Sequence, residues 1–182
     1  MHTEIYGKGI WLALLDCDRL FPQDPKGLGL ARALFSSIRD LPILSPHGHT
    51  DPEWFATNQP FENPAALFVT PDHYVCRMLN SHGIALESLG IKPIDGANYE
   101  KDSRKIWKRF ASHYYLFRGT PTRLWVDQVL QELFKVDRVL SKETADEIYD
   151  QIDHLLKQPE FSPRALFERF NIEVLATTES AL

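Results

Sequence analysis

The sequence is poor in cysteine, with Cys17 and Cys76 alone among 182 residues, and neither belongs to a CxxC pair. Two isolated cysteines cannot build the disulfide framework of a small secreted protein, so we expect a reduced, cytoplasmic protein. The apolar run near the N-terminus, Ile10–Leu15, is too short to span a bilayer. Asp16 and Asp18 follow that run at once and no basic segment precedes it, so we expect no signal peptide.

The chain also lacks a strong charge of one sign. Its 20 Lys and Arg residues and 25 Asp and Glu residues are scattered and give a formal net charge of -5. This balance offers no electrostatic reason to expect nucleic acid or an anionic membrane as a partner. No internal repeat or low-complexity tract is present, and 43% hydrophobic residues are typical of a soluble globular domain.

Helical periodicity covers most of the chain, and two short apolar runs read as strands. Trp107 and Trp125 lie on apolar helix positions and are expected in the core. Asp51 followed by Pro52, Thr120 and Ser141 suit helix starts. The predicted helices are 25–40, a short one through 54–56, 71–82, 98–117, 120–133, 141–156 and 163–170, and the predicted strands are a buried one at 41–44 and a second at 172–177.

The order of these elements is helix, strand, a long helical excursion and a second strand. Two parallel strands separated by helices belong to a larger α/β array, because two strands alone make no stable sheet. We therefore expect one incomplete domain over residues 1–182 and a fragment of a barrel. A leading helix and first strand would occupy 1–50, a helical insertion 51–170, and the second strand with a truncated end 171–182.

The strongest chemical signal is His47-Gly48-His49, directly after the first predicted strand. Residues i and i+2 of an extended segment point the same way, so both imidazoles could bind one cation such as zinc. The glycine between them permits close backbone approach. The alternative is that these are loop histidines hydrogen-bonded locally. Asp51 fits a helix cap better than a third ligand.

Weaker candidates lie at the start of the helix predicted over 71–82. Tyr74 could contact a ligand or be a core aromatic whose hydroxyl is satisfied. Arg77 lies one turn further, and a phenol beside a guanidinium could bind a carboxylate. A solvated surface position is the simpler interpretation of Arg77.

Four separated blocks, in this order, resemble uronate isomerase, also called glucuronate isomerase. They are Leu41–Pro52 (LPILSPHGHTDP), Thr70–Leu79 (TPDHYVCRML), His113–Trp125 (HYYLFRGTPTRLW) and Phe161–Ser180 (FSPRALFERFNIEVLATTES). The similarity extends over nearly the whole chain. Four ordered blocks are a far more specific signal than the HxH pattern alone.

The resemblance implies the N-terminal part of a distorted (β/α)8 TIM barrel of the amidohydrolase superfamily, with a long helical insertion between its first two strands. It implies interconversion of D-glucuronate with D-fructuronate and of D-galacturonate with D-tagaturonate. His47 and His49 match the family's metal ligands, usually with zinc, and Tyr74 matches a residue that faces the substrate. No nucleic acid or membrane partner is implied, and a homo-oligomer stays open.

The departure from the family is length, since its members are more than twice as long. The missing strands would carry an aspartate that completes the metal site and acts as the general base, so we expect this chain to be inactive alone. Two alternatives stay open: a metal-dependent amidohydrolase acting through a metal-bound hydroxide, and a non-catalytic fragment of a truncated gene.

Overall fold

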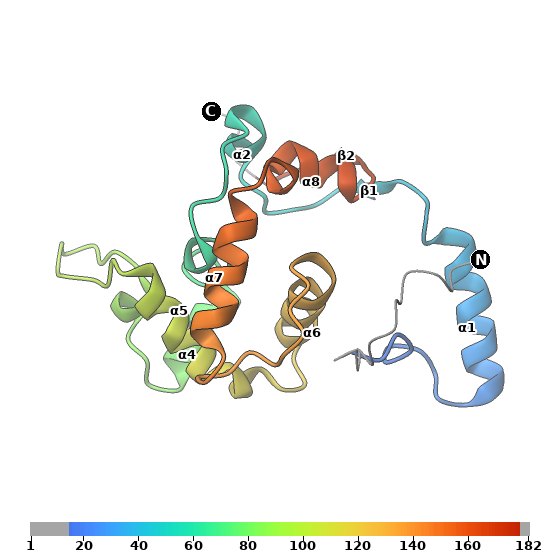
Figure 1. The fold of residues 1–182 in the computed structure, drawn as a ribbon, viewed down its shortest axis with the longest axis horizontal. Coiled ribbons are helices and arrows are strands. Elements are labelled where there is room, and N and C mark those ends of the chain that lie inside the picture. Colours follow the sequence, from blue (N-terminus) through green and yellow to red (C-terminus); the bar gives the residue numbers. More distant parts are fainter. Residues whose placement is uncertain (1–14, 179–182) are drawn as a thin grey trace.

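The computed structural model describes residues 15–178, so most of the Ile10–Leu15 run and residues 179–182 lie outside the described part. The described residues form helices and two strands (Figure 1). The α-helices are α1 (Pro25–Ile38), α2 (Pro52–Thr57), α3 (Pro64–Phe68), α4 (His73–Ser81), α5 (Ser103–Ser112), α6 (Pro121–Gln128), α7 (Ala145–Leu156) and α8 (Pro163–Arg169). The strands are β1 (Ile43–Ser45) and β2 (Ile172–Leu175), and shorter helical turns are η1 (Leu86–Leu89), η2 (Tyr114–Phe117), η3 (Val129–Leu133, a π-helix) and η4 (Pro159–Phe161).

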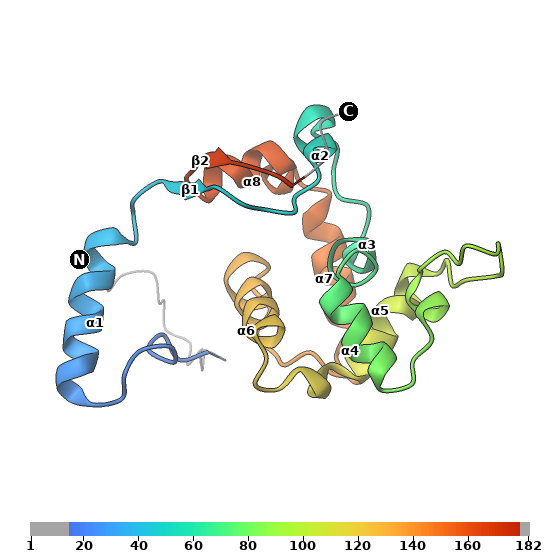
Figure 2. The ribbon, with the colours of Figure 1, turned by 180° about the vertical axis from the view of Figure 1, so that it is seen from behind.

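The two strands pair in parallel although most of the chain separates them. Ile43 lies opposite Ile172 and Leu44 opposite Val174, with an irregularity between Ile43 and Leu44. The connection between the strands is mainly helical, and Figure 2 shows β1, β2 and α8 together on one side of the helical body. The protein is therefore mixed α/β and mostly helical, as the element order predicted.

The core lies in the helical body formed by α3 to α7. Its largest fully buried side chains are aromatic, and one face of α5 and η2 is turned inward. The Trp107 indole N–H donates to the Ala145 carbonyl oxygen at 2.9 Å, which ties α5 to α7. The members of this aromatic group are Trp107, Phe110, Tyr114, Phe117 and Phe134.

Tyr114 brings a polar group into this core. Its hydroxyl donates to Asp127 Oδ1 at 2.9 Å, and the Arg123 guanidinium lies 4.1 Å from the centre of its ring. Arg123 Nε also donates to Asp127 Oδ2 at 2.6 Å. Burial, followed by the Asp127 charge, raises the pKa of Tyr114, so the hydroxyl remains the donor.

Several helices begin where the sequence predicted. Asp51 accepts a hydrogen bond from the Glu53 N–H ahead of α2, and Thr120 accepts one from the Arg123 N–H ahead of α6. Pro52 and Pro121 occupy the first helical position, where no backbone donor is needed. These helix starts are set by interactions between residues close in sequence, so they could be predicted from the sequence alone.

Other boundaries were predicted wrongly. The helix expected over 98–117 begins at Ser103, because Asp102 caps it, and it gives way to the η2 turn after Ser112. Ser141 is not the cap of α7, which begins at Ala145. The Ser141 hydroxyl instead accepts from the Glu143 N–H at 3.2 Å within the preceding turn.

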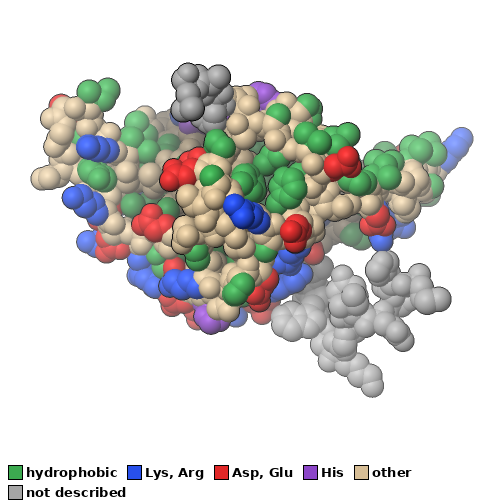
Figure 3. All heavy atoms as spheres, turned by 90° about the horizontal axis from the view of Figure 1, so that it is seen from above, with side chains coloured by type: hydrophobic (Ala, Val, Ile, Leu, Met, Phe, Trp, Pro, Cys, Tyr) green, Lys and Arg blue, Asp and Glu red, His purple; other side chains and the backbone are tan. Residues whose placement is uncertain are grey.

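The first strand was also predicted to be buried, and it is not. Ile43 is 46% exposed and Leu44 is 63% exposed. Parallel sheets are normally covered on both faces. The described residues form a sheet of two strands only, and they leave part of its surface uncovered. Leu30, Leu34 and Ile38 of α1 are similarly exposed, and Figure 3 shows hydrophobic side chains along this end of the molecule.

The prediction for Trp125 was wrong too, whereas the prediction for Trp107 is confirmed. Trp125 is 59% exposed because α6 turns the neighbouring Val126 inward. Within residues 15–178, every helix is too short or too polar to cross a bilayer.

The Tyr114 network generates a stability prediction. Tyr114→Phe removes the buried donor to Asp127, so we expect the free energy of unfolding to fall by about 1–3 kcal/mol. Urea unfolding of the purified chain measures the change. Tyr115→Phe is the matched control, because Tyr115 is 52% exposed and a surface change should alter stability by less than about 0.5 kcal/mol. Equal stability of the two variants would contradict the role given to the Tyr114 hydroxyl.

Candidate functional site

The backbone pairing of β1 and β2 continues past the ends of both strands. The Ala176 N–H donates to the Ser45 carbonyl oxygen at 2.9 Å, and the Thr178 N–H donates to the Gly48 carbonyl oxygen at 3.1 Å. A Cβ atom at Gly48 would lie 3.0 Å from the Ala176 carbonyl oxygen, so a glycine permits this close approach. The segment between the two histidines is therefore held against the segment that follows β2.

This arrangement brings the predicted histidine pair together. The ring centres of His47 and His49 lie 5.0 Å apart, and the rings are inclined at 83°. Both residues are exposed, so solvent and ions reach them. His49 Nδ1 lies 3.1 Å from the Thr178 hydroxyl, and the Ser45 hydroxyl donates to the His47 carbonyl oxygen at 3.2 Å.

The separation of the two ring centres is close to that of two histidines that share a metal ion. With Zn–N bonds of 2.0–2.1 Å and a tetrahedral angle, two imidazole centres lie about 5.2 Å apart. If Nδ1 of His49 carries the proton and donates to the Thr178 hydroxyl, the Nε2 lone pair is left for an ion. Metal-binding histidines usually make such a hydrogen bond with their other ring nitrogen. The donor set and its spacing thus fit a divalent metal.

The helix after the histidines is anchored to the helix before β2. Arg164 Nε donates to the Phe55 carbonyl oxygen at 2.8 Å, and its Nη2 donates to that of Ala56 at 3.1 Å. The Arg164 N–H also donates to Asn58 Oδ1 at 2.9 Å. These bonds satisfy carbonyl groups at the C-terminal end of α2, which no helical bond can reach. They fix α2 on α8 and so limit the movement of the chain that carries the histidines.

Tyr74 lies on the helical body, at the start of α4. Asp72 caps this helix and accepts from the Tyr74 N–H at 2.8 Å. Tyr74 is 58% exposed, which rules out the core interpretation, and its ring lies 4.1 Å from that of His73. Arg77 is exposed, as its surface interpretation predicted. Within residues 15–178, no hydrogen bond or ring contact joins Tyr74 to the histidine pair.

Tyr74 lines a cleft of about 270 Å³ between α4 and the start of α6. Its walls are mostly apolar, and Trp125 is the second exposed aromatic residue in it. The other lining residues are Met78, Phe117, Thr120, Pro121 and Thr122.

Two residues of these sites were missed from the sequence. Thr178 could have been found, because parallel strands end at the same edge and its position follows β2 as His49 follows β1. Trp125 could not have been found, because the helical spacing of apolar residues around it is equally typical of a core position.

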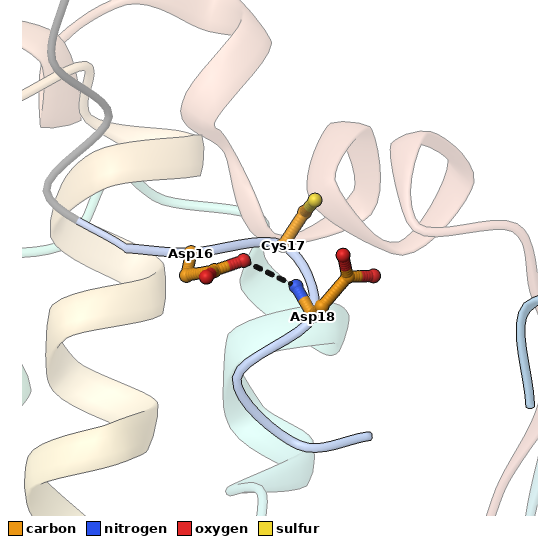
Figure 4. A group of neighbouring side chains, drawn as sticks. All are labelled: Asp16, Cys17 and Asp18. Atoms are coloured by element: carbon orange, nitrogen blue, oxygen red, sulfur yellow. Dashed lines mark hydrogen bonds between the residues drawn. The ribbon is translucent and has the colours of Figure 1, made fainter. Parts of the chain in front are cut away.

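A separate group of possible metal ligands lies near the start of the described residues, at Asp16, Cys17 and Asp18 (Figure 4). Asp16 Oδ1 accepts from the Asp18 N–H at 2.8 Å, which closes a turn. Asp18 is paired with Arg32, whose hydrogen bonds lower the pKa of the Asp18 carboxyl. Both carboxylates therefore have structural partners, and nothing else points to an ion here.

Cys17 and Cys76 are free cysteines, and Cys17 is exposed whereas Cys76 is buried. The Cys76 thiol is buried and lies 3.3 Å from the Val69 carbonyl oxygen. Burial raises the pKa of Cys76, which keeps it protonated and unreactive.

Comparison with known proteins identifies relatives that match most of this chain. The family model described as glucuronate isomerase matches residues 28–182. A uronate isomerase of Mesorhizobium japonicum is 59% identical over 94% of this chain and 36% of its own length, and one of Rhizobium meliloti is 53% identical over 93% and 36%.

Solved structures agree with the sequence comparison. A crystal structure of glucuronate isomerase from Caulobacter crescentus matches with a TM-score of 0.87 at 48% identity, over 92% of this chain and 35% of that one. A uronate isomerase from Thermotoga maritima matches with a TM-score of 0.76 at 30% identity, over 91% and 33%. The chain thus spans about a third of the length of these relatives. On the family match and these likenesses together, the chain belongs to the glucuronate isomerase family.

Proposed function

We propose that this chain contributes the metal-ligand pair and a substrate contact to a uronate isomerase. The observation that carries the proposal is the pair of perpendicular imidazoles, His47 and His49, at the shared end of two parallel strands in a chain of this family. In parallel barrels, catalytic groups lie at the C-terminal ends of strands. The reaction is the interconversion of D-glucuronate with D-fructuronate and of D-galacturonate with D-tagaturonate, in the cytoplasm.

We infer that β1 and β2 are the first two strands of a distorted (β/α)8 barrel. Three observations support this: their parallel pairing, the long helical connection between them, and the exposed apolar side chains of Leu44 and Val174. Leu44 and Val174 are paired across the sheet, so they share one face that needs cover. The additional length of the relatives supplies enough chain for the remaining strands.

The chain's own residues would bind and orient the substrate. His47 and His49 would hold the ion through neutral imidazole nitrogens, and the contact of Thr178 with Nδ1 would orient the His49 ring. A divalent ion, zinc in this proposal, supplies Lewis-acid polarisation of the substrate oxygens when bound. Tyr74 offers its exposed hydroxyl as a hydrogen-bond donor to the sugar.

The isomerisation moves a proton between C2 and C1 of the open-chain sugar, so it needs a general base. Residues 15–178 place no carboxylate in hydrogen-bond contact with the His47 and His49 side chains, and Asp51 is engaged as the cap of α2. We infer that the base is supplied by chain outside the described residues, and we expect the chain alone to be inactive.

A chimera tests this function. In it, the chain replaces the matching third of the Mesorhizobium japonicum relative, and conversion of D-glucuronate and D-galacturonate is measured alongside the isolated chain. We expect the chimera to isomerise both sugars and the isolated chain to isomerise neither. An inactive chimera beside an active parent enzyme would contradict the proposal.

The metal site generates a prediction for both histidines. His47→Ala or His49→Ala in the chimera removes one of two neutral nitrogen ligands, so we expect bound zinc to fall and turnover to drop by at least about 100-fold. Zinc per chain is measured by elemental analysis after dialysis. His154→Ala is the control, since His154 is exposed on α7 and should leave both quantities unchanged. Unchanged zinc content in His47→Ala would remove His47 from the ligand set.

The glycine between the histidines generates a second prediction. Gly48→Ala places a methyl group 3.0 Å from the Ala176 carbonyl oxygen, so the two segments must separate and the contact of His49 with Thr178 weakens. We expect zinc affinity to fall by about 10-fold to 100-fold. Gly29→Ala is the matched control, because no atom lies within 4 Å of the added carbon and α1 should be slightly stabilised. Equal zinc affinity in both variants would contradict the role given to Gly48 in positioning His49.

A further inference from the structure

We propose that Trp125 forms, with Tyr74, an aromatic subsite that binds the sugar of the uronate substrate. The inference rests on the proposed function, because it assigns the cleft between α4 and α6 to the same substrate. It adds a substrate-binding residue, Trp125, that lies outside both the His47–His49 pattern and the Asp72–Tyr74 segment.

The cleft presents one face of each of two helices. Tyr74 and Met78 are four residues apart on α4, and Thr122 and Trp125 are three residues apart on α6. Such spacings place each pair on a single helix face, so both helices turn a continuous surface toward the cleft. Its volume of about 270 Å³ is close to the lower end of ligand pockets and suits one monosaccharide.

The two aromatic side chains are unusually open to solvent for their size. Tyr74 is 58% exposed and Trp125 is 59% exposed, while Trp107 and Tyr114 are fully buried. An aromatic ring that keeps an apolar face and a polar edge in solvent can bind the C–H face of a sugar and one of its hydroxyl groups.

Unpaired polar groups accompany these rings. The Tyr74 hydroxyl, the Trp125 indole N–H and the Thr122 hydroxyl make no hydrogen bond among residues 15–178, and the Thr122 hydroxyl still reaches solvent although Thr122 is only 9% exposed. The Thr120 hydroxyl, by contrast, is engaged with the Phe117 carbonyl oxygen and the Arg123 N–H. Apolar walls with a few free donors and acceptors match a molecule whose faces are C–H groups and whose rim is hydroxyl groups.

The main competing occupant is protein, since the relatives contain further chain that could cover an apolar cleft. The free donors favour the sugar, because an apolar protein segment would leave the Thr122 hydroxyl and the indole N–H buried without partners. For variants of the cleft, a bound sugar predicts a rise in KM and a protein contact predicts no change in KM, so kinetics separate the two occupants.

The test uses Trp125→Ala, Trp125→Phe and Thr122→Val in the chimera, with KM and kcat for D-glucuronate and D-glucuronate binding by calorimetry. We expect Trp125→Ala to raise KM and Kd by about tenfold, with smaller rises in the other two variants and little change in kcat, because ground-state binding is lost. Tyr115→Phe is the control, since Tyr115 is exposed but does not line the cleft.

Unchanged KM and Kd in folded Trp125→Ala and Thr122→Val would overturn the inference and assign the cleft to a protein contact. If Trp125→Ala alone fails to fold, Trp125→Phe and Thr122→Val decide the matter by the same criterion. An inactive wild-type chimera would instead contradict the proposed function, whereas an active one with unaffected variants rejects this subsite alone.

Discussion

The parallel pairing of β1 with β2 is the contact on which the candidate site depends. It joins two segments that most of the described chain separates, and the pairing extends beyond the strands to the backbone of Gly48 and Thr178. Backbone hydrogen bonds of this kind fix position more firmly than a side-chain contact, because they set the register of every following residue. The positions of His49 and its Thr178 partner both follow from that register.

The helical body positions a second group of side chains, away from the strands. Its aromatic core around Trp107 and Tyr114 holds α4 and α6 in place, and these helices present Tyr74 and Trp125 to solvent. The sheet edge would thus supply the metal ligands and the helical connection the sugar contacts. The hydrogen bonds of Arg164 to the end of α2 join the helix that follows the histidines to the helix that precedes β2. Such a division is consistent with a chain that spans about a third of its relatives' length.

Features set by neighbours in sequence could be predicted, and features set by distant contacts could not. Asp51 and Thr120 cap helices through bonds to residues two and three positions ahead, and His47 and His49 are close because of their spacing. The exposure of Leu44 depends on how many strands flank it. The exposure of Trp125 depends on which face of α6 meets the core, which apolar spacing alone leaves undecided.

The central claim is that two imidazoles at one strand end share a single ion. Anomalous diffraction at the zinc absorption edge, from crystals of the zinc-loaded chimera, tests it most directly. The account predicts one strong peak with a nitrogen of His47 and a nitrogen of His49 each within about 2.0–2.1 Å. A peak bound to one of these histidines alone, or zinc located only elsewhere in a folded and active protein, would contradict it.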